Sequence, residues 1–210
     1  MSDKSYLSIY AKSFSWAGFF LPRETLEKCS ILYDFCRVAD NIADDKDKIE
    51  VKEKKFAEFE NDFNQKKFDN LIIKNMWGIM EEFNISIKIV QDLLTGIKSD
   101  IKEKVEINSK KDLLIYSYRV AGTVGLMMAK ILNVTKKNSL KSAIDLGIAM
   151  QLTNISRDVL EDSKNNRFYI EKNFENISST VNLANRYYQD SFYAIKSIPI
   201  SFRFSILVAR

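Results

Sequence analysis

The chain is organised around residues 151–162, which read Gln-Leu-Thr-Asn-Ile-Ser-Arg-Asp-Val-Leu-Glu-Asp. Each residue of an α-helix turns the chain by about 100°, so Asp158 and Asp162 lie one above the other, roughly 6 Å apart along the axis. Gln151 and Asn154 fall on the same face. Carboxylate and amide oxygens are ligands for a hard divalent cation. A single acidic pair also fits a solvated helix face, so a metal site requires a partner elsewhere in the chain.

A second acidic pair stands near the end of the helix predicted for residues 23–45. Tyr33, Arg37, Asp40 and Asp44 share one narrow face of that helix by the same arithmetic. Carboxylates at a helix C-terminus oppose the helix dipole, which favours a cation as their partner. Two such helices facing each other form a negative cleft, because like charges held close together resist ionisation unless cations offset them.

Mg²⁺ in such a cleft would make it a site for a diphosphate, since Mg²⁺ typically binds through one or two carboxylates together with substrate phosphates. Metal ions and basic side chains stabilise a departing diphosphate electrostatically. Lys164 and Arg167 follow Asp162 in a basic loop, where they are suited to contact that anion. Apolar and aromatic walls beyond would hold a hydrocarbon and favour a nearby carbocation. These residues indicate ionisation of a prenyl diphosphate.

The composition favours a helical domain. Only 6 Gly and 2 Pro occur in 210 residues, which disfavours turn-rich β folds, and the apolar fraction of 46% is sufficient for a sizeable core. The chain has no histidine, which excludes His-dependent triads and His-ligated metal sites. A formal charge of +4 without a dense Lys/Arg block gives no support for nucleic-acid binding.

Several features predict a cytoplasmic location. Cys29 and Cys36 are two helical turns apart, too far to form a disulfide, and are expected to be reduced. Residues 1–10 are polar and do not resemble a signal peptide. Residues 113–132 are apolar and long enough to span a membrane, but Arg119 near their middle favours a buried core helix. Peripheral attachment to the inner membrane face is compatible with lipid-like substrates.

The remaining segments predict further helices. Residues 46–68 are charge-rich and predict a surface helix and loop without chemistry, and residues 98–109 read as a polar connection. Apolar periodicity predicts the other helices over residues 5–20, 71–83, 85–97, 110–132, 139–162, 180–196 and 200–210.

Small residues form one face of the helix predicted for residues 110–132. They are Ala121, Gly122, Gly125 and Ala129. Glycine inside a helix costs roughly 1 kcal/mol relative to alanine, so two glycines on one face indicate close approach by a neighbouring helix or by a ligand.

Four ordered motifs resemble those of the squalene/phytoene synthase family of head-to-head prenyltransferases. They are Ser13-Phe-Ser-Trp with Leu21-Pro22, Leu32-Tyr-Asp-Phe-Cys-Arg-Val-Ala-Asp-Asn-Ile-Ala-Asp44, Tyr116-Ser-Tyr-Arg-Val-Ala-Gly-Thr-Val-Gly125, and residues 146–162 followed by Arg167-Phe-Tyr169. The resemblance runs over nearly the whole chain and is strongest to bacterial-type phytoene synthases. It implies an all-α isoprenoid-synthase bundle around a central cavity, with residues 1–210 as a single domain.

The resemblance also implies roles for individual residues. It implies Mg²⁺, with Mn²⁺ as the alternative ion, held together with diphosphate by Asp40, Asp44, Asn154, Asp158 and Asp162. It gives as diphosphate contacts Ser13, Tyr33, Arg37 and Arg157, to which the basic loop adds Arg167. Tyr116 matches the family tyrosine beside the reacting carbons. Two prenyl diphosphates would condense to a cyclopropylcarbinyl diphosphate, which a second ionisation would rearrange.

Two departures from the family pattern bear on this prediction. Asn41 stands where many members have aspartate, which removes one charge and leaves the pair Asp40 and Asp44. The family also continues for several tens of residues beyond the position that matches Arg210, so the C-terminal helix region is expected to be missing.

The leading prediction is condensation of two geranylgeranyl diphosphates to phytoene in carotenoid synthesis, without NADPH. One alternative is a C30 enzyme that converts farnesyl diphosphate to squalene, hydroxysqualene or dehydrosqualene. Another is a non-catalytic truncated paralogue, and a third is a membrane-embedded helical protein. Neither a monomer nor a dimer is favoured by the sequence.

Overall fold

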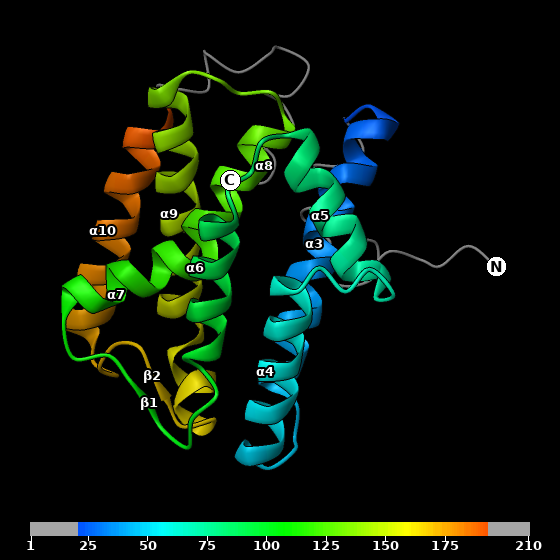
Figure 1. The fold of residues 1–210 in the computed structure, drawn as a ribbon. Helices are drawn as coiled ribbons and strands as arrows, with labels where there is room; N and C mark the ends of the chain where they lie inside the picture. The colour runs from blue at the N-terminus through cyan, green and yellow to red at the C-terminus, as the bar shows by residue number, and fades with distance from the viewer. Residues whose placement is uncertain (1–20, 193–210) are drawn as a thin grey trace.

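The structure, a computed structural model, describes residues 21–192, and almost all of its regular structure is helical (Figure 1). The helices predicted for residues 5–20 and 200–210 lie outside the described residues. In chain order the elements are α3 (Arg23–Asp44), α4 (Ile49–Asn64), α5 (Leu71–Glu82), α6 (Ile87–Lys98), β1 (Val105–Glu106), α7 (Lys110–Ser117), the π-helix η1 (Tyr118–Gly122), α8 (Thr123–Ile131), α9 (Lys137–Lys164), β2 (Arg167–Phe168) and α10 (Phe174–Phe192).

Helix α3 confirms the helix predicted for residues 23–45. Pro22 precedes it with φ −55°, where a missing backbone N–H costs the helix nothing. One stripe of α3 is buried in the core and consists of Cys29, Leu32, Phe35, Ala39 and Ala43. These positions recur every three or four residues, which is the spacing of one helix face. The stripe fixes the rotation of α3 and so determines where its polar face points.

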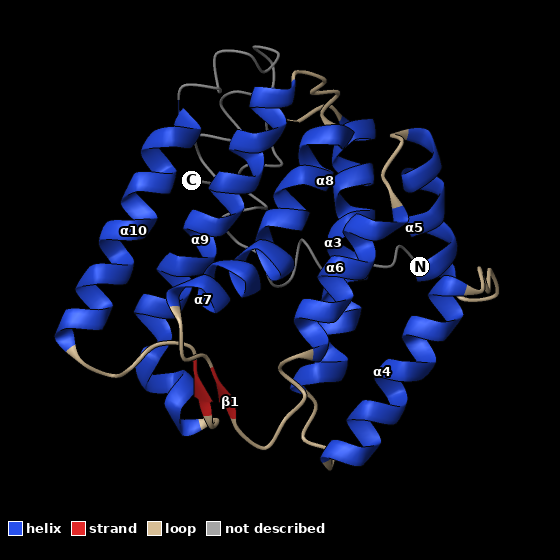
Figure 2. Cartoon of the chain, turned by 60° about the vertical axis from the view of Figure 1, so that its left-hand side comes forward, coloured by secondary structure: helices blue, strands red, loops and turns tan. Residues whose placement is uncertain are grey.

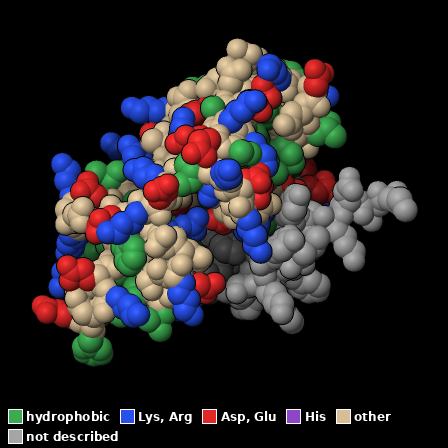
Figure 3. Space-filling model, turned by 90° about the horizontal axis from the view of Figure 1, so that it is seen from below, with side chains coloured by type: hydrophobic (Ala, Val, Ile, Leu, Met, Phe, Trp, Pro, Cys, Tyr) green, Lys and Arg blue, Asp and Glu red, His purple; other side chains and the backbone are tan. Residues whose placement is uncertain are grey.

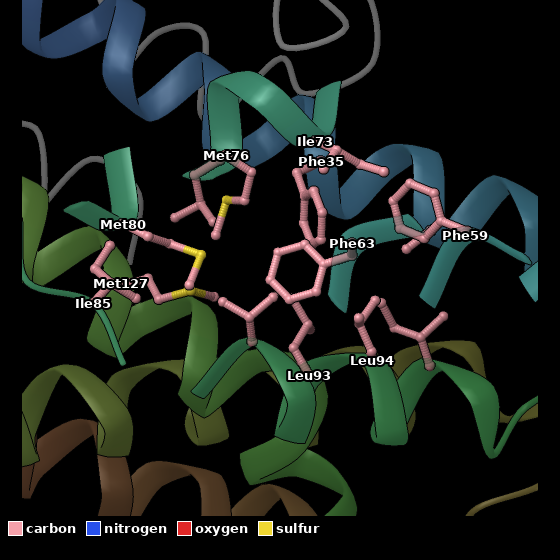
Figure 4. Close-up of a cluster of buried hydrophobic side chains, with 14 of the residues drawn as sticks. Phe35, Phe59, Phe63, Ile73, Met76, Met80, Ile85, Leu93, Leu94 and Met127 are labelled. Atoms are coloured by element: carbon pink, nitrogen blue, oxygen red, sulfur yellow. The ribbon is translucent and has the colours of Figure 1, made fainter. Parts of the chain in front are cut away.

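The main core joins α3 to α4, α5, α6 and α8 (Figure 4). Phe35 lies with its ring centroid 5.4 Å from those of both Phe59 and Phe63 of α4. The prediction that residues 46–68 form only a surface element was therefore incomplete. Its charged residues do face solvent, but Phe56, Phe59 and Phe63 are buried, each at a hydrophobic gain of about 2 kcal/mol.

The helix predicted for residues 110–132 is continuous, but its middle part is a π-helix rather than an α-helix. Residues 110–131 run through α7, η1 and α8, so the helix predicted for residues 110–132 is confirmed, with one π-helical turn inserted directly after Tyr116 and Ser117. A π-turn shifts the faces of the helix on either side of it, and such turns are frequent at functional sites.

The face of small residues on this helix packs against α9. A Cβ atom added at Gly125 would lie 2.2 Å from the carbonyl oxygen of Ala143, and one added at Gly147 would lie 2.3 Å from that of Ala121. Real side chains never approach backbone atoms that closely, so the two backbones meet because both positions are glycine. At Gly125 the small face therefore serves helix packing rather than a ligand.

Helices α9 and α10 lie side by side (Figure 1). Helix α9 runs for 28 residues and contains the whole predicted helix 139–162. The last described helix was predicted to start at residue 180 but starts at Phe174. The side chain of Asn173 explains the difference, because its Oδ1 accepts a hydrogen bond from the backbone N–H of Asn176 at 2.8 Å and caps the helix early.

Two short strands join the polar connection to the basic loop. β1 and β2 pair in parallel with Val105 opposite Arg167 and Glu106 opposite Phe168, and Figure 2 shows the pair in red. Each strand is only two residues long, which is too short for an alternating pattern to appear in the sequence. The pairing brings the segment after α6 next to the segment after α9.

None of the helices in residues 21–192 is long and apolar enough to cross a membrane. The apolar segment 113–132, which was the only support for a membrane-embedded protein, is the core helix just described. Cys29 is buried and Cys36 is half-buried, and both are free thiols. The face seen in Figure 3 carries Lys and Arg interspersed with Asp and Glu rather than a patch of one sign.

Candidate functional site

The two acidic helices are joined by Arg167. The C-terminal ends of α3 and α9 lie at the same end of the molecule, at the bottom of Figure 1. Arg167 of β2 places its Nη2 at 2.6 Å from Oδ1 of Asp44, the last residue of α3. The Arg167 guanidinium is largely buried, whereas the Asp44 side chain is 52% exposed. A cation from the basic loop thus neutralises part of the predicted negative cleft.

The carboxylates of this cleft still lack sufficient positive charge. Burial and the neighbouring Asp44 raise the pKa of Asp40 to about 7, although Arg37 acts in the opposite direction. Burial and the neighbouring Asp158 raise the pKa of Asp162 to about 6. Asp40 and Asp162 therefore resist ionisation, because each is partly buried and lies one helical turn from a second carboxylate. A bound cation would offset the repulsion and favour the ionised forms.

Arg157 and Asp158 are paired with each other. The guanidinium Nε and Nη2 atoms of Arg157 donate to the two carboxylate oxygens of Asp158 at 2.7 and 2.6 Å. This contact holds the pKa of Asp158 below its usual value. The predicted metal ligand and the predicted diphosphate contact thus neutralise each other in this structure, and Asn154 lies exposed one turn before them on α9.

The acidic residues suit a metal ion that binds together with a diphosphate. Within the described part of the chain, no three Asp, Glu or Cys side chains come close enough together to hold a metal ion by themselves. Mg²⁺ needs only one or two carboxylates when substrate phosphates supply its other ligands. The pairs Asp40 with Asp44 and Asp158 with Asp162 provide that number on each helix. The residues present therefore fit Mg²⁺ bound with a diphosphate, where it would act as a Lewis acid.

The remaining predicted diphosphate contacts lie on α3 or outside the described residues. Tyr33 and Arg37 are half-buried on the same face as Asp40. Burial raises the pKa of Tyr33, so its hydroxyl stays protonated and able to donate. Ser13 lies outside residues 21–192, and its role stays a prediction.

Tyr116 is buried among aromatic and acidic partners. It is 8% exposed, and its hydroxyl donates to Oδ2 of Asp100 at 2.7 Å. Tyr169 donates to Oδ1 of the same carboxylate at 2.9 Å, and its ring stacks on that of Tyr116 with centroids 4.8 Å apart. Asp100, Tyr116 and Tyr169 together form a hydrogen-bonded group, the Asp100–tyrosine cluster.

Asp100 was not among the residues predicted for the site. Residues 98–109 predict only a polar connection, because a single aspartate in a polar segment belongs to no periodic pattern that would indicate its partners. Asp100 is nevertheless in electrostatic range of both acidic helices, since its charge raises the pKa of Asp40 and of Asp162. Nearby, Asp162, Arg167 and Tyr169 help to line a small hollow beside α9. The wider central cavity stays a prediction.

Comparisons with known proteins agree with this arrangement. A family model described as squalene/phytoene synthase matches residues 7–173. The 15-cis-phytoene synthase of Pantoea ananas is 30% identical over 176 residues, which cover 78% of this chain and 57% of that protein. The phytoene synthase of Rhodobacter capsulatus is 32% identical over 162 residues, which cover 75% of this chain and 48% of that protein. The chain thus spans about half the length of these relatives.

A solved structure gives the same result for the fold. A dehydrosqualene synthase in complex with ligand superposes with a TM-score of 0.79 at 27% sequence identity, covering 98% of this chain and 81% of that one. The all-α isoprenoid-synthase fold predicted from the sequence is confirmed. With 167 of its residues matched in order, from residue 7 to residue 173, the chain belongs to the squalene/phytoene synthase family.

Proposed function

We propose that the protein condenses two geranylgeranyl diphosphates head to head to form phytoene, in the presence of Mg²⁺. The observation that carries this proposal is the convergence of two aspartate pairs and Arg167 at one end of the bundle, next to a buried tyrosine. The curated relatives named phytoene synthase support this substrate, at about 30% identity. The pair Asp40 and Asp44 and the pair Asp158 and Asp162, with Asn154, are proposed to hold the ion and the diphosphates.

The basic residues receive the leaving group in this proposal. Each ionisation breaks a carbon–oxygen bond, and the electron pair leaves with the diphosphate. Arg167 and Arg157 are held beside Asp44 and Asp158 and would shift their pairing to the diphosphate oxygens as these gain charge. Tyr33, Arg37 and Ser13 complete the proposed contacts. The charge of the guanidinium groups lowers the barrier because it is already fixed where negative charge develops.

The new carbon–carbon bonds are proposed to form next to Tyr116. The allylic carbocation left by the first ionisation is attacked by the double bond of the second substrate, and loss of a proton gives a cyclopropylcarbinyl diphosphate. A second ionisation releases the second diphosphate, the ring opens by rearrangement, and loss of a second proton from the resulting allylic cation gives the central double bond of phytoene. Tyr116 is proposed to lie beside these cations, where the electron-rich face of its ring and the partial negative charge of its hydroxyl oxygen stabilise them.

A C30 reaction on farnesyl diphosphate is the alternative. The similarity to a dehydrosqualene synthase structure favours it, since that protein superposes with a TM-score of 0.79 at 27% sequence identity. Both reactions use the same diphosphate chemistry and differ in the length of hydrocarbon that the cavity accepts. The lipid-like tails also favour peripheral contact with the inner membrane face in either case.

Product analysis decides between these functions. The protein is incubated with Mg²⁺ and either geranylgeranyl or farnesyl diphosphate, and the hydrocarbon is identified together with released diphosphate. We expect phytoene from the longer substrate alone, with no requirement for NADPH and no turnover after chelation of the metal. A C30 hydrocarbon from farnesyl diphosphate alone would support the alternative. Failure to release diphosphate from either substrate would overturn the proposal and favour a non-catalytic family member.

A further inference from the structure

Asp100 holds two phenols at once, and none of the roles above explains it. It lies two residues beyond the end of α6, and its carboxylate is partly buried. Tyr116 comes from α7 and Tyr169 from the segment after β2, so three separate elements meet at this carboxylate. Each carboxylate oxygen accepts one phenol proton, at 2.7 and 2.9 Å, and the two hydroxyl oxygens are 3.1 Å apart.

No lysine or arginine among residues 21–192 forms an ion pair with Asp100. The charge of Arg167 acts on Asp100, but the guanidinium itself is paired with Asp44. Burial raises the pKa of Asp100, and among the described residues the hydrogen bonds from the two phenols oppose that shift most, ahead of the charge of Arg167. Hydrogen bonds to an ionised acceptor are roughly twice as strong as neutral ones, so this arrangement fixes both rings firmly.

Donation to Asp100 determines what Tyr116 presents to its surroundings. A phenol has a single proton, and in this cluster the Tyr116 proton is used on Asp100. The lone pairs of the oxygen and the face of the ring that Tyr169 does not cover remain for other partners. A hydrogen bond to a carboxylate also polarises the phenol and increases the negative charge on its oxygen and ring. Such a group stabilises a cation better than a free phenol does.

The cluster is also tied to the acidic helices through one strand. Arg167 is the first residue of β2, and Tyr169 is the residue that directly follows the strand. Arg167 reaches Asp44, while Tyr169 reaches Asp100. Residues 167–169 thus contact both Asp44, which is proposed to hold the ion and the diphosphates, and the cluster proposed to stabilise the carbocation.

We propose that Asp100 is a positioning residue for Tyr116, which it orients and polarises so that the phenol oxygen and ring stabilise the carbocation formed when a prenyl diphosphate ionises. This inference rests on the proposed function. A purely architectural role, in which Asp100 only anchors the β2 segment to α6, is the competing explanation. The two explanations differ in whether Asp100 and Tyr116 act on the rate together.

A double-mutant cycle on the full chain tests the coupling. Asp100→Asn keeps the shape of the side chain and removes its charge, and Tyr116→Phe keeps the ring and removes the hydroxyl. We expect each single variant to lower kcat by roughly 10- to 100-fold while KM changes by less than about threefold. The double variant is expected to be no more than about threefold slower than Tyr116→Phe alone, because Asp100 has no hydroxyl left to orient.

Asp92→Asn is the matched control. Asp92 of α6 accepts a hydrogen bond from the hydroxyl of Tyr118 of η1 at 3.3 Å, so the chain offers a second aspartate–tyrosine pair close to the first. Its loss is expected to change kcat by less than about twofold. Tyr169→Phe supplies a second probe that leaves the Asp100 charge in place, and we expect an intermediate loss of kcat from it. Circular dichroism and melting temperatures compare the folding of all variants.

The outcomes separate this inference from the function on which it rests. An inactive wild-type protein would overturn the proposed function and this inference with it. An active wild type in which the effects of Asp100→Asn and Tyr116→Phe multiply would overturn the inference alone. An unchanged kcat in Asp100→Asn would also overturn the inference alone. If Asp100→Asn does not fold, a kcat for Tyr169→Phe equal to that of the wild type would contradict the proposal, and an intermediate kcat would support it.

Discussion

Asp40 is a proposed metal ligand whose ionised carboxylate lowers the stability of the folded protein. Burial and the nearby Asp44 raise its pKa to about 7, far above the usual value of 3.8. In the folded protein Asp40 therefore retains its proton at pH values at which the unfolded chain has lost it. The stability that this protonation contributes is complete below the unfolded pKa and is lost as the pH rises towards 7. The ionised Asp40 carboxylate thus lowers the free energy of unfolding most at neutral pH, where it would bind a cation.

Asp40→Asn is expected to make the metal-free protein more stable at neutral pH. Asparagine has a similar shape and carries no charge, so the variant avoids the cost of ionising a buried carboxylate. We expect its melting temperature to exceed that of the wild type, by a margin that widens between pH 5 and pH 8. Thermal melts at several pH values in the presence of a chelator measure that margin. A margin that stays constant over this range would show that Asp40 is not the titrating group.

At the scale of elements, glycine decides how closely α8 and α9 pack. Gly125 lies against the backbone of α9, where an added Cβ would meet the carbonyl oxygen of Ala143 at 2.2 Å. The backbone cannot yield to such a contact without moving one helix. This packing positions α9, and with α9 it positions the aspartates at its C-terminal end.

Gly125→Ala and Gly78→Ala should therefore have opposite effects on stability. Gly125→Ala is expected to lower the free energy of unfolding by about 1–3 kcal/mol through the clash with α9. Gly78 of α5 has no atom within 4 Å of an added Cβ, so Gly78→Ala should raise that free energy by up to about 1 kcal/mol, because alanine restricts the unfolded chain. Chemical denaturation measures both variants, and a neutral Gly125→Ala would contradict the packing described here.

At the scale of the whole molecule, periodic features could be predicted from the sequence and isolated ones could not. The acidic faces of α3 and α9 repeat every three or four residues, so both helices could be predicted from spacing, whereas the partnership of their acidic pairs around a metal ion stays a prediction. The buried phenylalanines of α4 were hidden by a surrounding excess of charge. Asp100 and the two-residue strands β1 and β2 depend on contacts between distant segments, which no local pattern encodes. Asp100 and these strands are the missed features that connect the acidic helices to Tyr116.

We propose that the two acidic helices together ionise a prenyl diphosphate. This is tested by measuring diphosphate release from geranylgeranyl diphosphate with Mg²⁺ by the wild type and by Asp40→Asn and Asp158→Asn, one variant for each helix. We expect turnover by the wild type and its loss by both variants, with the helix content measured by circular dichroism unchanged. Near-full activity in either variant would contradict this proposal, because the two helices would then not share the metal and the diphosphate.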